Sequence, residues 1–279
     1  MLVHQHSKSP DKSPKFSSDS SPTLADMMLK KKGKSLNSIQ FQNTPLKTTI
    51  LDQFDGWGTS LFRHYNRKMN VFNRGFGGYT SYWLNFMIPS LLDGIPSRPP
   101  ALVTLLIGTN DASTRGNQHV PLNHYKKYLS EIIAKIKEKA PHSKILVLTP
   151  PPVSAKDVMG GHFLFKVLLE YRNACIDAFH AIEGQENLEL LDTWDLFIPG
   201  KKYDHPSFDP NTLDHYFSDK LHFSGEGGRV LFEGVVKVIE RKWPYLDAKN
   251  VVAPVPLEFQ NGPSEERGDD DAVKKWLGL

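Results

Sequence analysis

Apolar runs and amphipathic stretches alternate between about residue 50 and residue 245. The run ALVTLLIG at 101–108 ends in a glycine, and KILVLT at 144–149 is followed by three prolines, so both predict strands buried on two faces. NVFN at 70–73 and LELLD at 188–192 predict two shorter strands. The chain thus carries four predicted strands, separated by stretches of a different period.

Helical spacing of apolar residues predicts helices in those separating stretches and after the last strand. They span 59–69, 81–92, about 121–139, about 163–183 and 225 to about 243. Strands interleaved with helices imply a parallel sheet covered on both faces. We therefore expect an α/β fold, a three-layer sandwich with a central parallel sheet.

The two ends of the chain differ in composition from this middle part. Residues 1–36 hold many serines, prolines and lysines and few large apolar side chains, so they cannot offset the entropy of an ordered chain and predict a disordered tail. Residues 250–279 are rich in proline and acids before an apolar end, which indicates a C-terminal appendage. The predicted domain is 37–249.

Composition limits the class of protein. The 279 residues are 39% hydrophobic and 23% charged, enough for one core of about 200 residues. No run of 18 apolar residues and no long apolar N-terminal stretch occurs, so we expect no membrane span, no secretory signal and a cytoplasmic protein. The lone cysteine, Cys175, cannot form an internal disulfide and is predicted to lie in the core.

The net charge of +3 belongs to the N-terminal tail. Residues 1–50 hold eight lysines and three aspartates, which leaves −2 for residues 51–279. The cluster Lys30–Lys34 can be read as a nuclear-import or acidic-surface patch, or as solvated charge, which is the more common case. We expect no nucleic-acid partner, and the oligomeric state stays open.

Chemistry in parallel sheets collects in the loops beyond the carboxyl ends of the strands, so the residues after each strand come first. Asp219 and His222 stand three apart in SDKLHFSGEGG. One tight turn can bring this carboxylate against Nδ1 of the imidazole, which is the arrangement of an oriented general base. A capped turn is the alternative, because this spacing is common.

Two further loops hold candidates for binding a negatively charged oxygen. In GTNDAS, Asn110 can offer its side-chain N–H₂ to an oxyanion, and Asp111 can hold the loop by hydrogen bonds to backbone N–H groups. In NRGFGGYTS, Gly78 can bring a backbone N–H close to such an oxygen. Either loop can also be a plain turn. Neither nucleotide-binding glycine pattern is present, so no nucleotide cofactor is predicted.

Together NRGFGGYTS, GTNDA and SDKLHFS resemble the second, third and last conserved blocks of the SGNH (GDSL) hydrolases, in the family's order. FDGWGTSL and LHFSGEG look closest to the isoamyl acetate-hydrolysing esterase branch. The resemblance implies a flavodoxin-like sheet, Gly78 and Asn110 as oxyanion donors, His222 as base and Asp219 as its partner. The family has glycine where this chain has Lys220, a departure that affects the turn.

The family's first block, an apolar strand ending in Phe-Gly-Asp-Ser, does not occur in the window SIQFQNTPLKTTILDQF. The nearest match is FQNT, which puts Thr44 at the nucleophile's place and Gln42 at that of the turn glycine. The first strand is therefore predicted to be weak or missing. We consider three hypotheses: a sequence from which the true first block was lost, which we favour, a pseudoenzyme that binds acyl esters, and Thr44 as a working nucleophile.

The resemblance implies hydrolysis of small acetate or short-chain acyl esters through an acyl-enzyme, with no metal and no organic cofactor. The partner expected is thus a small-molecule ester. The alternative is a catalytically inactive protein that retains the pocket and binds such esters.

Overall fold

The computed structural model describes residues 36–42, 56–95, 99–253 and 270–277. The chain divides into two units, residues 1–32 and residues 33–279. Every element described below belongs to the second unit. The predicted tail, 1–36, lies outside the described residues except for Leu36, with which the first strand begins.

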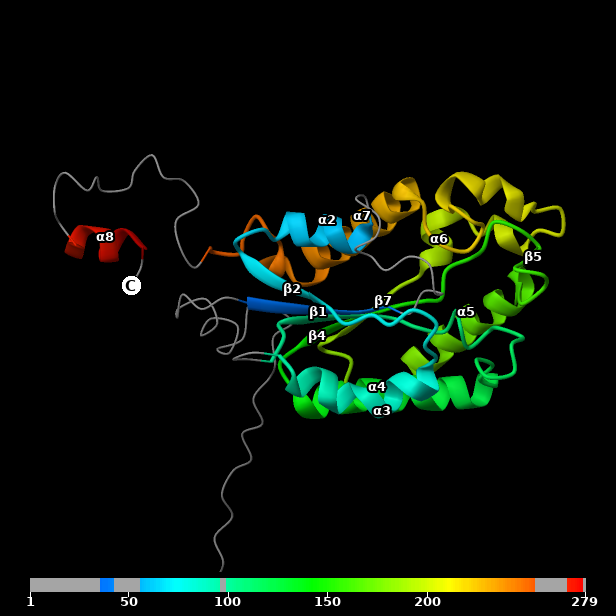
Figure 1. Ribbon diagram of the computed structural model, residues 1–279, viewed down its shortest axis with the longest axis horizontal. Helices are drawn as coiled ribbons and strands as arrows, with labels where there is room; N and C mark the ends of the chain where they lie inside the picture. The colour runs from blue at the N-terminus through cyan, green and yellow to red at the C-terminus, as the bar shows by residue number, and fades with distance from the viewer. Residues whose placement is uncertain (1–35, 43–55, 96–98, 254–269, 278–279) are drawn as a thin grey trace, which may run out of the picture. The chain divides into compact units, whose positions relative to one another are not determined.

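Five parallel strands form the central sheet in the order β2-β1-β3-β4-β7 (Figure 1). Their bounds are Leu36–Gln42 for β1, Met69–Asn73 for β2, Leu102–Leu106 for β3, Lys144–Leu148 for β4 and Leu188–Leu191 for β7. All five residues of β3 are buried. The four strands predicted from the sequence are confirmed, and the apolar run of β3 suits a strand covered on both faces.

The first strand, which was predicted to be weak or missing, is present. β1 lies in the middle of the sheet, where Ile39 faces Phe72 of β2 on one side and Val103 of β3 on the other. Main-chain hydrogen bonds to two neighbouring strands stabilise β1 although its sequence is half polar. The half-polar sequence SIQFQ therefore gave only a weak strand pattern, although the segment forms a strand between two neighbours.

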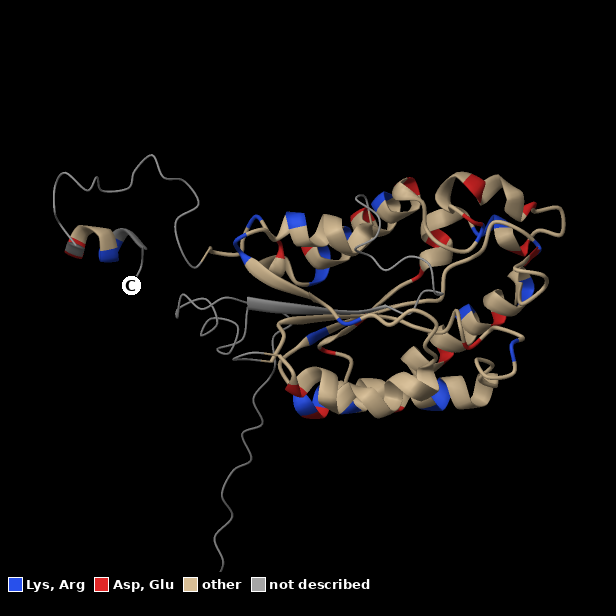
Figure 2. Ribbon diagram, in the orientation of Figure 1, with Lys and Arg blue, Asp and Glu red and all other residues tan. Residues whose placement is uncertain are grey.

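Helices cover both faces of the sheet, which confirms the three-layer sandwich (Figure 1). One layer holds α2 (Trp57–His64) and α7 (Gly225–Lys242), with α6 (Thr193–Phe197) packed on α7. The other holds α3 (Ser81–Asp93), α4 (Leu122–Lys139) and α5 (Phe165–His180). Both layers carry charges of both signs (Figure 2), and Cys175 is fully buried on α5, as predicted.

Two predicted helices are shorter in the structure. The helix predicted at 59–69 ends at His64, because a turn follows in which Arg67 has a φ of +61°. Tyr65 and Met69 are four residues apart and both are buried. This spacing is also the one expected for a further turn of helix, which explains the longer prediction. The helix predicted at 163–183 begins at Phe165.

The structure also contains short elements that the sequence did not predict. They are the hairpin of β5 (Asp157–Val158) and β6 (Phe163–Leu164), the 3₁₀ helices η1 (Lys202–Asp204), η2 (Pro210–Tyr216) and η3 (Pro244–Leu246), and the helix α8 (Asp270–Leu277). Val251 is 6% exposed and belongs to the buried hydrophobic cluster.

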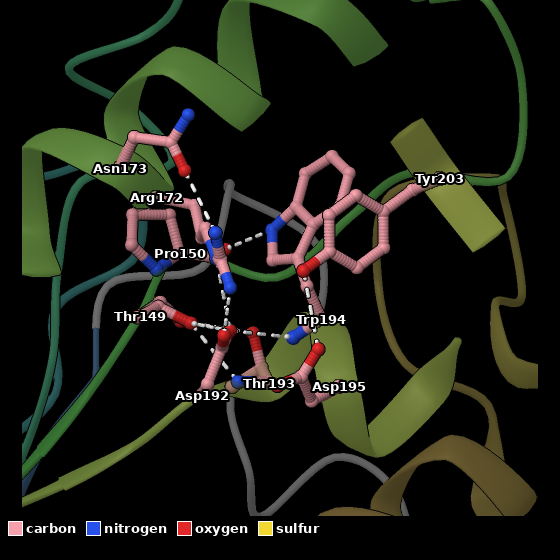
Figure 3. Close-up of polar contacts among 9 residues, drawn as sticks. All are labelled: Thr149, Pro150, Arg172, Asn173, Asp192, Thr193, Trp194, Asp195 and Tyr203. Atoms are coloured by element: carbon pink, nitrogen blue, oxygen red, sulfur yellow. Dashed lines mark hydrogen bonds and ion pairs between the residues drawn. The ribbon is translucent and has the colours of Figure 1, made fainter. Parts of the chain in front are cut away.

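A polar network joins the carboxyl ends of β4 and β7 to α5 and α6 (Figure 3). Asp192, directly after β7, forms a two-pronged ion pair with Arg172 of α5 through Nη2 and, at 3.2 Å, through Nε. The same carboxylate accepts from the Trp194 N–H at 3.1 Å and from Thr149 Oγ1 at 3.2 Å. One carboxylate thus caps α6 and fixes this edge of the sheet.

Candidate active site

The loop before α7 holds the predicted acid–base pair in a closed turn. His222 Nδ1 lies 2.6 Å from Asp219 Oδ2, and the backbone N–H of His222 donates to Asp219 Oδ1 at 2.8 Å. The turn is closed by Ser218 N–H, which donates to the His222 carbonyl at 2.8 Å. The sequence therefore brings together the two side chains that were predicted to meet.

Burial and hydrogen bonding give the two groups different environments. The His222 side chain is 2% exposed and that of Asp219 is 40% exposed. Burial alone would raise the pKa of Asp219, but hydrogen bonds from His222 and from the Leu221 N–H outweigh it and hold that pKa below its ordinary value. Asp219 is therefore a carboxylate at neutral pH, able to orient the imidazole through Nδ1.

Lys220 has a φ of +72°, the left-handed region in which glycine is at ease and other residues are strained. Its carbonyl accepts from the Ser154 N–H at 3.0 Å, which ties this turn to the loop after β4. The departure from the family's glycine therefore changes the cost of the turn without preventing the Asp219–His222 contact.

Gly78 lies in a tight turn between β2 and α3. Its φ is +80°, and the Tyr79 N–H donates to the Phe76 carbonyl across the turn at 3.4 Å. Positive φ at the third position is typical of a type II turn and favours glycine. The residue is buried.

Asn110, in the loop after β3, is fully buried and contacts this turn. Its Nδ2 donates to the Tyr79 carbonyl at 2.8 Å, and its Oδ1 has no hydrogen-bond partner among the residues that the structure describes. The chain leaves β3 through Gly108, whose φ is +123° and where a Cβ would lie 2.6 Å from Pro150 Cγ. Glycine there allows the close approach that places Asn110.

Asp111 is also fully buried and accepts from the Ser81 N–H, at 3.0 and 3.1 Å to its two oxygens, and from Ser81 Oγ. Ser81 is the first residue of α3. Burial raises the pKa of Asp111 to about 7, although the hydrogen bonds from Ser81 oppose this shift. The loop after β3 is therefore joined to the start of α3.

Sequence reasoning missed Gln118, which lies in the same loop. It is 8% exposed, and its Nε2 donates to the Gly78 carbonyl at 2.8 Å. The surrounding TRGNQHV has no periodic pattern, so nothing in it marks a buried side chain.

The loop after β4 contacts both halves of the site. Besides the Ser154 contact with the Lys220 carbonyl, the Thr114 N–H donates to the His162 carbonyl at 2.9 Å. Thr114 belongs to the loop that carries Asn110, whereas Lys220 belongs to the loop that carries His222. The candidate nucleophile Thr44 lies outside the described residues.

In the part of the chain that the structure describes, no group of three or more His, Cys, Asp or Glu side chains is placed to hold a metal ion. Within the same ranges, no helix combines the length and the apolar character that crossing a membrane requires.

A parallel α/β sandwich with a His–Asp pair and an asparagine after the buried third strand is the arrangement of an SGNH-type ester hydrolase. A model of the GDSL-like lipase/acylhydrolase family matches residues 44–230. This match covers more than half of the chain, which therefore belongs to that family of carboxylic ester hydrolases.

Two relatives have names that fit this family. The isoamyl acetate-hydrolyzing esterase 1 homolog of Mus musculus is 30% identical over 203 residues, which cover 68% of this chain and 76% of the mouse protein. The isoamyl acetate-hydrolyzing esterase of Saccharomyces cerevisiae is 26% identical over 229 residues, covering 78% of this chain and 88% of the yeast protein.

Solved structures share the fold. The acetyl xylan esterase AlAXEase has a TM-score of 0.56 at 17% identity, with 73% of this chain and all of that chain covered. A lipase/acylhydrolase from Enterococcus faecalis has a TM-score of 0.52 at 17% identity, with 74% and 96% covered. At such identities the likeness concerns the fold alone.

Proposed function

We propose that this site is built to hydrolyse small acetate or short-chain acyl esters, with His222 as general base. The contact of 2.6 Å between His222 Nδ1 and Asp219 Oδ2 carries the proposal, because it fixes the imidazole in one tautomer. The names of the mouse and yeast relatives support a small acetate ester as substrate.

In the proposed reaction, the base takes the proton of a hydroxyl nucleophile as that oxygen attacks the ester carbonyl. Nδ1 is engaged with Asp219, so the proton goes to Nε2 and is later given to the leaving alcohol. We assign the Gly78 N–H and the second hydrogen of Asn110 Nδ2 to stabilising the oxyanion. Water then attacks the acyl-enzyme with the same base, and the free acid is released.

Thr44 is the candidate nucleophile, two residues after the end of β1. Gln42 replaces the glycine of the family's turn, and a threonine carries an extra methyl group at the attacking centre. We therefore expect this chain to hydrolyse p-nitrophenyl acetate barely above background. Binding of acyl esters without turnover is the second candidate function, favoured by the same missing Gly-Asp-Ser.

Hydrolysis of p-nitrophenyl acetate by the wild type and by Thr44→Ala and His222→Ala separates these functions. Slow hydrolysis that falls in His222→Ala supports the proposed site. Fast turnover that Thr44→Ala abolishes would contradict the expected low rate and identify Thr44 as nucleophile. Equal rates in all three proteins, with calorimetric binding of ethyl acetate or isoamyl acetate, favour the binding function.

A further inference from the structure

We propose that Gln118 is a positioning residue, which holds the turn at Gly78 so that its backbone N–H faces the reacting oxygen. This inference rests on the proposed role of Gly78 as an oxyanion donor. Gln118 contacts no reacting atom in the proposed reaction and acts through the Gly78 carbonyl, to which its Nε2 donates at 2.8 Å.

The Gly78 N–H belongs to the central peptide of the turn that runs from Phe76 to Tyr79. This peptide can point to either face of a β-turn, and the sign of φ at the third residue distinguishes the two forms. Glycine accepts both signs with little cost. The observed φ of +80° is therefore one of two states that glycine can adopt, and contacts from outside the turn can stabilise it.

The turn's own hydrogen bond is a poor candidate for this selection, since the Tyr79 N–H lies 3.4 Å from the Phe76 carbonyl. Two buried amides in the loop after β3 make shorter contacts. Gln118 Nε2 holds the Gly78 carbonyl and Asn110 Nδ2 holds the Tyr79 carbonyl, both at 2.8 Å. The Gly78 carbonyl belongs to the Gly78–Tyr79 peptide, which follows the central one, so Gln118 anchors the turn on the C-terminal side of the Gly78 N–H.

The other end of the Gln118 side chain shows which part of the amide makes the contact. Its Oε1 is buried and has no hydrogen-bond partner within the described ranges 36–42, 56–95, 99–253 and 270–277. A buried acceptor without a partner is costly, so an apolar side chain of similar shape would pack there at lower cost. The presence of a side-chain amide at position 118 is therefore explained by its Nε2 donor, which contacts the Gly78 carbonyl.

The test compares Gln118→Met, which keeps the shape and removes the donor, with Gln118→Glu, which can donate only when its carboxyl is protonated. A matched control is Gln185→Met, because Gln185 Nε2 donates to the Phe179 carbonyl at 3.0 Å, at the far end of α5. The readouts are amide hydrogen exchange of residues 76–82 and the kcat and KM for p-nitrophenyl acetate from pH 5 to pH 9.

In Gln118→Met we expect exchange in 76–82 to rise at least fivefold, kcat to fall about tenfold to a hundredfold, and KM to change by less than about twofold. The kcat of Gln118→Glu relative to the wild type should rise as the pH falls, because the protonated carboxyl donates to the Gly78 carbonyl. Gln185→Met should match the wild type in both readouts.

Unchanged exchange in 76–82 in both Gln118 variants would overturn the proposal, even if the wild type turned out to be inactive. Faster exchange without any loss of kcat, in a wild type that is active, would overturn it as well. An inactive wild type with faster exchange in the variants would contradict the proposed hydrolysis and support the role of Gln118 in holding the turn. If Gln118→Met does not fold, the pH dependence and exchange of Gln118→Glu decide.

Discussion

Lys220 stands between the members of the acid–base pair in a left-handed conformation, with a φ of +72°. This conformation destabilises the folded state by about 1–2 kcal/mol when the residue is not glycine. Glycine avoids this strain but loses more backbone entropy on folding, which reduces the gain by about 0.5–1 kcal/mol. We expect Lys220→Gly to raise the free energy of unfolding by about 0.5 kcal/mol, measured by urea denaturation. Lys220→Ala keeps the strained backbone and should not stabilise; equal gains in both would attribute the effect to the lysine side chain.

Asp111 predicts a dependence of stability on pH. Its pKa is raised to about 7 in the folded protein, chiefly by burial, against about 3.9 in an unfolded chain. The folded state therefore binds more protons between these values, and stability falls as the pH rises from about 4 to about 7.

The free energy of unfolding of the wild type, relative to that of Asp111→Asn, should decrease across this window by a few kcal/mol, on the order of the shift itself. It should be level above about pH 8. Urea midpoints for both proteins from pH 4 to pH 8 test this. A constant difference would mean that Asp111 does not change protonation on folding in this range.

At this scale the sequence predicted the Asp219–His222 contact because the two residues are close in the chain and one turn can join them. It did not predict Gln118, forty positions from Gly78, because the pairing of the two depends on how the loop after β3 folds back onto the turn before α3. The burial of Asp111 was likewise out of reach, since a carboxylate in GTNDAS has the same sequence whether it is exposed or enclosed.

At the scale of the elements, one ion pair between Arg172 and Asp192 links α5 to α6 and to the ends of β4 and β7 (Figure 3). The side chains of Arg172 and Asp192 are 12% and 17% exposed, so removing either partner leaves a largely buried charge. We expect Asp192→Ala to cost about 3–5 kcal/mol of unfolding free energy, and Arg172→Met to cost less, because Asp192 also caps α6.

A double-mutant cycle measures the coupling of this pair. The double variant should be more stable than the sum of the single losses predicts, by about 1–3 kcal/mol, because neither charge is then left alone. Lys126 and Asp177 provide a control pair, 44% and 68% exposed at 3.9 Å, for which we expect a coupling of less than about 0.5 kcal/mol. Additive losses at Arg172 and Asp192 would show that the two side chains contribute independently.

The elements predicted best were those whose burial is uniform, since β3 and β4 are apolar along nearly their whole length. The element predicted worst was β1, because its place between two strands is a property of the sheet and leaves no apolar run in SIQFQ. The hairpin of β5 and β6 was missed for a related reason, since two residues per strand are too few to show a period of two.

For the molecule as a whole, the central place of β1 predicts that the fold fails without it. Proline at position 40 lacks the N–H that a strand paired on both sides needs, and Gln40 is paired with Asn73 and Thr104. We expect Gln40→Pro to abolish cooperative thermal unfolding as followed by circular dichroism. Gln40→Val keeps the N–H and should unfold cooperatively, whereas a cooperative transition in the proline variant would mean that β1 is dispensable.

The packing of α7 on α2 also sets an order of events at the ribosome. The buried side chains of α2, Trp57 and Leu61, are made early, while the helix that packs on α2 ends only at Lys242. At about 5 to 20 residues per second, about ten to thirty-five seconds pass between the synthesis of the two helices. During that time the nascent chain presents the apolar face of α2 without its final partner, which is the kind of surface that ribosome-associated chaperones bind.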